Sequence, residues 1–105
     1  MCYGEREEDA RKTAHRYFRW SVTGWSVKAE LPDTDSFAAA SKHVSPETVA
    51  QFVSCGPSPE RHLQAIDRYV KAGYDHIILV QVGPDQDGFF KFFERELASS
   101  WRKTA

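Results

Sequence analysis

The chain has 105 residues, a common size for one domain, so we expect at most a single folded unit. Its hydrophobic fraction of 41% and aromatic fraction of 13% are typical of a chain that buries a core, which excludes a disordered protein. The 14 Lys and Arg residues nearly balance the 15 Asp and Glu residues, so the basic excess that nucleic-acid binding requires is absent. We expect a globular unit that does not bind nucleic acid.

The start of the chain, MCYGEREEDA, has neither the basic nor the apolar region of a secretion signal. No apolar run reaches the roughly 18 residues of a membrane span. These features predict a cytoplasmic protein without a membrane partner. A single disulfide is not expected in such a chain, so we interpret Cys2 and Cys55 as free thiols.

Charge order and apolar spacing predict the first helix, over about residues 5–20. Acidic residues open this segment and basic residues follow, as suits a helix dipole, and Ala10 and Ala14 begin its apolar stripe. The next stretch, SVTGWSVKAELPDTD, has the scattered apolar residues of a long loop that carries aromatics. DSFAAASKHV then predicts a short helix capped by Asp33 or Asp35.

Two later segments, SPETVAQFV and SPERHLQAIDRYVKAG, open with the same Ser-Pro-Glu start. Ser45 and Ser58 are suited to cap helices there, because proline at the first helical position loses no hydrogen bond. The second helix should end at residue 72 or at Gly73, which suits a left-handed stop. Its predicted buried face consists of Leu63, Ile66, Tyr69 and Val70.

The run HIILVQV predicts a strand over about residues 75–82 that is covered on both faces, as in parallel α/β sheets. After the turn GPDQDG, the segment FFKFFERELASSW predicts an amphipathic closing helix. Its stripe would consist of Phe89, Phe93, Leu97 and Trp101. The strand lacks neighbours, because the candidates MCY and FVSCG are too short to give a sheet.

Several motifs together show a resemblance to a known family. VSCGP, AGYDH and VGPDQDGFF, in this order, with CYGEREEDARKTAHRYF upstream, resemble the carboxy-terminal end of luciferase-like oxidoreductases. The resemblance is closest to the coenzyme F420-dependent branch related to glucose-6-phosphate dehydrogenase. It implies an α/β fold, the carboxy-terminal part of a TIM barrel that is mostly helical as an isolated chain.

The resemblance also implies how this single segment is divided. Residues 1–20 would be a strand stub and helix, residues 21–54 an insertion loop with short helices, and residues 55–105 the last helix–strand–helix unit. The family's catalytic residues lie on strands absent from this sequence, so none is assigned. The chain alone is expected to be inactive, and measurable F420-dependent turnover would contradict this.

In the complete barrel the cofactor would be F420, with FMN as the alternative, and hydride would pass to or from a small organic substrate. Neither cofactor is expected to bind this chain alone. The family also implies a homodimer. Candidate pocket residues are those at the predicted strand end and Lys28 in the insertion, where sugar-phosphate-using relatives place a phosphate-binding lysine. The full set is Lys28, Gln81, Gly83, Asp85 and Gln86.

Three local motifs carry a functional and a structural interpretation side by side. The four histidines lack the spacing of a zinc site, so we expect no metal and read them as surface or half-buried imidazoles. Cys55 is either a thiolate activated by the following helix or, as we favour, a small buried residue. VGPDQDG is either a phosphate cradle or, as we favour, a simple turn with an Asp cap.

A rival hypothesis treats the chain as a small helical module without catalysis. It would bind a partner through the Phe-rich helix, with Phe89, Phe90, Phe92 and Phe93 as an exposed patch, and the HIILVQV strand would pair with its own copy. Trp20 and Trp25 would shape either a substrate pocket or a dimer contact. The rival requires a chain that folds without an amino-terminal half.

Overall fold

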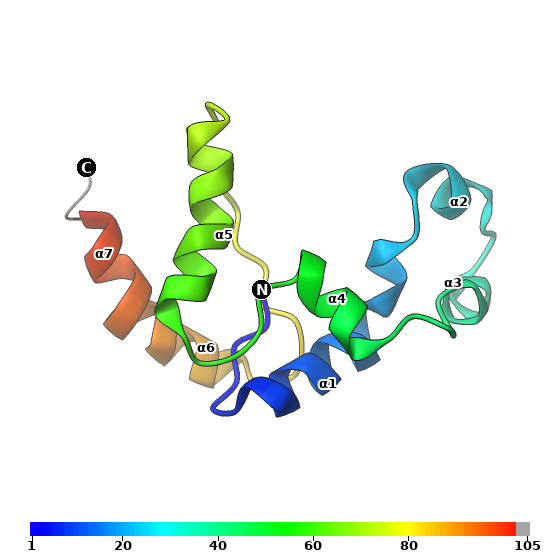
Figure 1. The fold of residues 1–105 in the computed structure, drawn as a ribbon, viewed down its shortest axis with the longest axis horizontal. Coiled ribbons are helices and arrows are strands. Elements are labelled where there is room, and N and C mark those ends of the chain that lie inside the picture. Colours follow the sequence, from blue (N-terminus) through cyan, green and yellow to red (C-terminus); the bar gives the residue numbers. More distant parts are fainter. Residues whose placement is uncertain (103–105) are drawn as a thin grey trace.

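A computed structural model describes the backbone of residues 1–102 and the side chains of residues 1–100. Within residues 1–102 there is no β-strand and no sheet, so the prediction of a TIM-barrel part with a strand over residues 75–82 is wrong. The polypeptide folds instead as a series of short helices (Figure 1). In order they are α1 (Glu7–Phe18), the 3-10 turn η1 (Arg19–Val22), α2 (Trp25–Glu30), α3 (Thr34–Ala40), α4 (Pro46–Phe52), α5 (Pro59–Lys71), α6 (Gln86–Phe92), the π-helical turn η2 (Phe93–Leu97) and α7 (Ala98–Arg102).

The predicted helix starts are confirmed by their caps. The Ser45 hydroxyl accepts the Thr48 N–H at 3.1 Å at the start of α4, and Ser58 caps α5 in the same way. Of the two candidates for α3, the cap is Asp33, which accepts the Ser36 N–H at 2.8 Å. After α5, Gly73 adopts φ +98°, the left-handed stop expected of glycine.

The segment over residues 21–35, predicted as a loop, contains the end of η1 and all of α2. Helix α2 begins after Gly24 and ends before Leu31, and its second half consists of the good helix formers Lys28, Ala29 and Glu30. The loop prediction was based on the scattered apolar residues of this segment and overlooked the helix propensity of these three residues.

Helix α5 buries only the first half of the predicted face: Ile66 is buried and Leu63 is half-buried against the closing helix. His62 and Ile66 are buried, whereas Tyr69 is 55% and Val70 48% exposed. The reason is the position of the helix, because its carboxyl end projects beyond the other described helices (Figure 1), and Tyr69 meets only the Tyr74 ring, at 6.1 Å between centroids.

The closing helix exists as predicted, but η2 interrupts its regular spacing. A π turn closes hydrogen bonds over five residues rather than four, which rotates the following residues about the axis. Phe89 and Leu97 are buried as expected, and Phe92 rather than Phe93 is buried between them. The Trp101 side chain, the last residue of the predicted stripe, lies outside the described side chains.

The centre of the molecule is a junction where residues 1–3 lie between two other extended segments. Cys2 N–H donates to Ser54 O and Gly56 N–H to Cys2 O, which makes one parallel bridge between Cys2 and Cys55. On the other side, the Val82 N–H donates to Met1 O at 2.9 Å. The ladder stops there, because residues 1–3 are too few to pair with the rest of residues 75–82.

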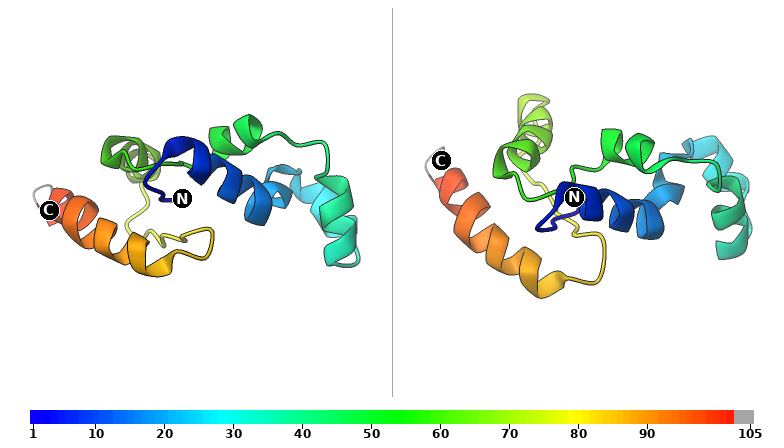
Figure 2. Two further views of the ribbon diagram at one scale, coloured as in Figure 1. Left: turned by 90° about the horizontal axis from the view of Figure 1, so that it is seen from below. Right: turned by 60° about the horizontal axis from the view of Figure 1, so that its bottom comes forward.

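Two small hydrophobic cores flank this junction. The first, called here the junction core, joins α1 and α4 to the extended segments and consists of Cys2, Ala10, Ala14, Val49, Val53, Cys55 and Val82. The second is formed by Phe89, Phe92 and Leu97 of the closing helix, with Tyr3 stacked on Phe92 at 4.4 Å between ring centroids. Helices α2 and α3, residues 25–40, form a lobe that we call the α2–α3 lobe. It lies at the end of the molecule opposite to α7 (Figures 1 and 2).

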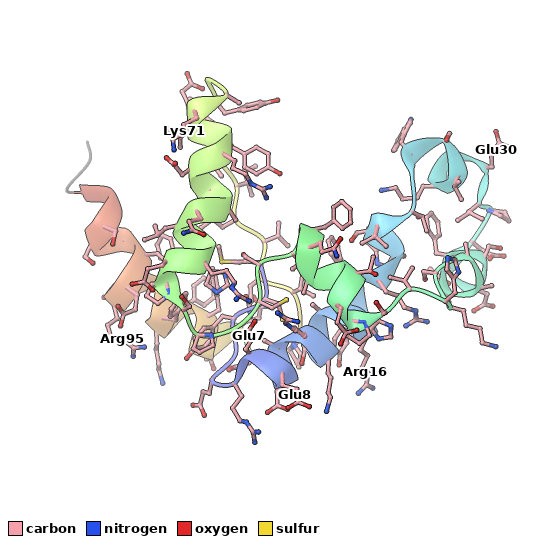
Figure 3. All side chains as sticks on the ribbon, viewed as in Figure 1. Glu7, Glu8, Arg16, Glu30, Lys71 and Arg95 are labelled. Atoms are coloured by element: carbon pink, nitrogen blue, oxygen red, sulfur yellow. The ribbon has the colours of Figure 1, made fainter. Side chains whose placement is uncertain are left out.

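The overall shape is elongated, with extents of 44 × 31 × 20 Å. The radius of gyration is 14.8 Å, against about 13 Å for a typical domain of this length. Charged side chains such as Glu8, Lys71 and Arg95 project outward from their helices (Figure 3). The exposed area is 7490 Å², whereas a monomer of 12.0 kDa is expected to expose about 6,000 Å². An unusually large surface is therefore left uncovered.

Candidate interaction surface

Three of the predicted pocket residues have side chains that form hydrogen bonds around the turn that leads into α6. The Gln86 side-chain amide donates to Gly83 O at 2.8 Å and to Gln81 O at 3.2 Å. The Gln81 amide pairs with Tyr3, accepting its N–H and donating to its C=O. Asp85 accepts the Gly88 N–H at 2.9 Å and so caps α6, as the simple-turn interpretation of VGPDQDG requires.

The other two predicted pocket residues have structural surroundings as well. Gly83 has φ +100°, and a Cβ added there would lie 2.6 Å from a methyl carbon of Thr13, so its backbone packs closely on α1. Lys28 lies in the α2–α3 lobe, where its Nζ reaches Ser21 O at 3.4 Å. None of the five lines any of the three cavities described below. Because the polar groups of this turn already bind the protein's own backbone, the turn does not fit a deazaflavin.

His62 is completely buried, contrary to the surface or half-buried position expected of the histidines. The Ser54 hydroxyl donates to Nδ1 at 2.7 Å and Nε2–H donates to Gly56 O at 2.8 Å, so the ring is held in one neutral tautomer. Burial lowers the pKa of His62 below its ordinary value. The signal missed in the sequence is the four-residue spacing of His62 and Ile66, which places both on one helix face.

Both cysteines are free thiols, as predicted, and both are buried, which was predicted for Cys55. Burial raises the pKa of Cys2 to about 11, and the pKa of Cys55 is raised for the same reason. A nucleophilic cysteine needs a low pKa and access to substrate, so Cys55 is a packing residue of the junction core. Among residues 1–100 the structure brings together no group of three metal-ligating side chains. No helix of the described chain is long and apolar enough to cross a membrane.

The most unusual surface lies along residues 75–80, which we call the open segment. Ile78 is 90% and Val80 60% exposed, while Ile77 and Leu79 between them are half-buried. This alternation is typical of an extended strand with one bare face. In the described structure the N–H and C=O groups of residues 75–79 make no backbone hydrogen bond, and pairing begins only at Val80 O, which accepts the Met1 amino group.

Apolar cavities lie on both sides of the open segment. On the Ile77–Leu79 side, a cavity of about 390 Å³ is lined by these two residues and by Phe89, Phe90 and Phe93. On the other side, a groove of about 500 Å³ separates the open segment from α5. Its exposed aromatic residues are Phe52, Tyr69 and Tyr74. Of the four phenylalanines in the predicted patch only Phe90 is strongly exposed, so the prediction is wrong for Phe89 and Phe92.

No protein-family model and no curated protein matches the chain. The resemblance to F420-dependent oxidoreductases therefore stays a prediction based on its motifs. What the fold defines is a small helical protein with one bare, strand-like segment between apolar grooves.

Proposed function

We propose that the chain is a non-catalytic interaction module that binds a second copy of itself through the open segment. The observation that carries this proposal is the near-complete exposure of Ile78, at 90%, on a backbone whose own hydrogen bonds are unmade. Unpaired strand edges associate with other strands unless charge, proline or a covering element blocks them. Asp75 and its neighbour His76 are the only titratable residues of the segment, residues 77–80 contain neither charge nor proline, and none of the described elements covers Ile78.

A second copy is the occupant that this surface fits. Two identical extended segments pair in antiparallel fashion about a twofold axis, each supplying the donors that the other lacks. The open stretch of residues 75–79 has about the length of a common strand. The chain has a net charge of −1, so two copies repel each other only weakly. The apolar grooves would then be covered by the partner's Ile78 and Val80.

The uncovered area supports the same proposal. The exposed surface of 7490 Å² exceeds that of a typical monomer by about 1,500 Å². A standard protein interface removes only about 800 Å² from each partner. The chain therefore has enough surplus surface to form a dimer and still expose a normal surface.

The test is the self-association of the whole chain, measured by sedimentation equilibrium between 1 and 200 µM. The wild type is expected to dimerise, and Ile78→Lys is expected to weaken the dimer at least about tenfold, since burying an isoleucine contributes about 1.5–3 kcal/mol. Ile78 is exposed in the monomer, so the substitution should leave the helical circular dichroism spectrum unchanged.

The matched control is Trp25→Lys, which places the same charge on another large exposed residue, 80% exposed on α2 at the far end of the molecule. It should associate like the wild type. A wild type that is monomeric throughout this range would overturn the proposal. Equal weakening by both variants would show that the chain associates without using the open segment.

A further inference from the structure

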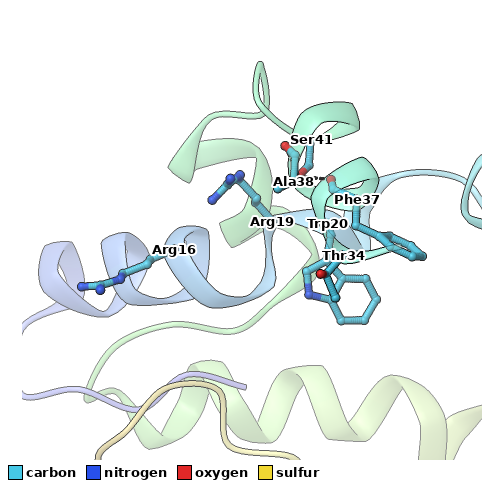
Figure 4. A pocket seen from close by; sticks show the side chains of 7 residues that line it. All are labelled: Arg16, Arg19, Trp20, Thr34, Phe37, Ala38 and Ser41. Carbon is cyan, nitrogen blue, oxygen red and sulfur yellow. Dashed lines mark hydrogen bonds between the residues drawn. The ribbon is translucent and has the colours of Figure 1, made fainter. Parts of the chain in front are cut away.

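A separate cavity lies in the α2–α3 lobe, away from the open segment. It has a volume of about 400 Å³ and opens between the end of α1 with η1 on one side and α3 on the other (Figure 4). Seven residues line it: Arg16, Arg19, Trp20, Thr34, Phe37, Ala38 and Ser41. Ligand pockets of small molecules start at about this volume.

The body of the cavity is aromatic. Trp20 and Phe37 meet edge to face, with ring centroids 5.9 Å apart. Phe18 meets Trp20 in the same way, with ring centroids 4.9 Å apart. The Trp20 side chain is not sealed into this cluster, because it remains 38% exposed. The Lys28 ammonium lies over the Trp20 ring, 5.8 Å from its centroid, and the rest of the ring surface is apolar and can be covered by an aromatic or branched aliphatic group.

The charge at the rim is positive, and the Arg16 guanidinium lies over the Tyr17 ring, 5.3 Å from its centroid. Neither Arg16 nor Arg19 makes an ion pair within the described residues. Asp33, the residue before the lining residue Thr34, caps α3 by accepting both the N–H and the hydroxyl of Ser36, and it forms no ion pair within the described residues. The buried Ser41 hydroxyl donates to Phe37 O at 2.8 Å, so it has no proton to offer a ligand.

We propose that this cavity binds a small organic acid with an apolar body, its ring or chain against Trp20 and Phe37 and its carboxylate against Arg19. Figure 4 shows the Arg19 guanidinium on the Ser41 side of the cavity, whereas Arg16 extends along α1 away from the rings. An arginine presents a planar fork of donors that matches a carboxylate. The binding site is independent of self-association through the open segment.

The test uses 3-phenylpropionate and its neutral counterpart 3-phenylpropanol, which share one body and differ in the charged group. Binding is followed by tryptophan fluorescence and by ligand-detected NMR saturation transfer. For a ligand of this size we expect a dissociation constant on the order of 1 mM for the acid. The alcohol is expected to bind about tenfold more weakly, because a charge-assisted pair to Arg19 is lost.

Two variants separate the carboxylate contact from general charge. Arg19→Gln should reduce the preference for the acid to about one, while Arg6→Gln, which removes an exposed charge at the start of α1, should leave the preference unchanged. Trp20→Phe should abolish the fluorescence change but keep the NMR signal. Equal binding of acid and alcohol by the wild type would overturn the carboxylate assignment. No saturable NMR signal for either compound would overturn the site.

Discussion

The junction core and the open segment differ in one respect, the covering of their extended backbone. In the junction core, residues 1–3 pair on both sides, and the helices α1 and α4 cover the side chains, so Cys2, Ala14 and Val49 are entirely buried. In the open segment an equally apolar stretch has free backbone groups and a bare face. Apolar composition alone therefore does not bury a strand. A neighbour of sufficient length must also be present.

The largest expected effect contrasts a covered with an uncovered phenylalanine on the same helix. Phe92 is 1% exposed and stacks on Tyr3, whereas Phe90 is 62% exposed. Phe92→Ala should reduce the free energy of unfolding by about 3–5 kcal/mol, since it leaves a cavity in the second core. Phe90→Ala should change it by less than about 0.5 kcal/mol at concentrations where the chain is monomeric.

Urea unfolding followed by circular dichroism measures both values. The half-buried Phe93 gives an internal check, because Phe93→Ala is expected to fall between the two. If Phe90→Ala proved as costly as Phe92→Ala in the monomer, the helix would face the opposite way. The π turn accounts for the burial of Phe92 and Leu97 on one face, because these residues are five apart, whereas a regular four-residue stripe would place Phe93 first.

The sequence predicted the helices better than it predicted the packing between them. Short-range signals such as Ser45, Ser58 and Gly73 act within a few residues, and the structure confirms all three. Burial of Tyr69 and the strand over residues 75–82 depended instead on distant neighbours. No local pattern reveals whether such neighbours exist, so both predictions failed.

The candidate site residues failed for a related reason. Polar residues in a turn satisfy either a ligand or the backbone of the turn itself, and both uses favour the same amino acids. The side chains of Gln81, Asp85 and Gln86 bind backbone groups, which spacing alone does not distinguish from a pocket. The cavity at Trp20 and Phe37 depends on two helices meeting at an angle that the sequence does not encode locally.

The next effect tests the hydrogen bonds by which His62 joins α5 to residues 54–56 beside the junction core. His62 is buried and bound to both Ser54 and Gly56, so His62→Ala should reduce stability by about 1–3 kcal/mol at pH 7.5 by leaving these groups without partners. His76, on the open segment, has a side chain that is 93% exposed, and His76→Ala should have almost no effect.

His62 also makes the stability of the chain depend on pH, with a sign that follows from the direction of its pKa shift. The folded pKa of His62 lies below its ordinary value of 6.5, so the unfolded chain takes up a proton first as the pH falls. Its stabilising contribution is therefore complete above about pH 6.5 and declines as the pH drops toward the folded pKa. Urea midpoints between pH 8 and pH 5 should show this decline in the wild type and His76→Ala. A decline just as steep in His62→Ala would assign it to other groups.

The smallest expected effect compares two serine caps, one on α4, which packs in the junction core, and one on α5, which projects from it. Helix α4 packs chiefly on α1, and its cap bond from Thr48 N–H to the Ser45 hydroxyl is 3.1 Å long. The equivalent bond of α5, from Arg61 N–H to Ser58, is 3.5 Å long, near the limit of a hydrogen bond. Ser45→Ala should cost about 1 kcal/mol in the free energy of unfolding and Ser58→Ala less than about 0.5 kcal/mol. Ser45→Asn, which retains a capping oxygen, should restore most of the loss. If Ser45→Ala and Ser58→Ala were equally destabilised, α4 and α5 would contribute alike to the cooperative unfolding of the chain. The contrast between the junction core and the open segment would then hold only for their surfaces.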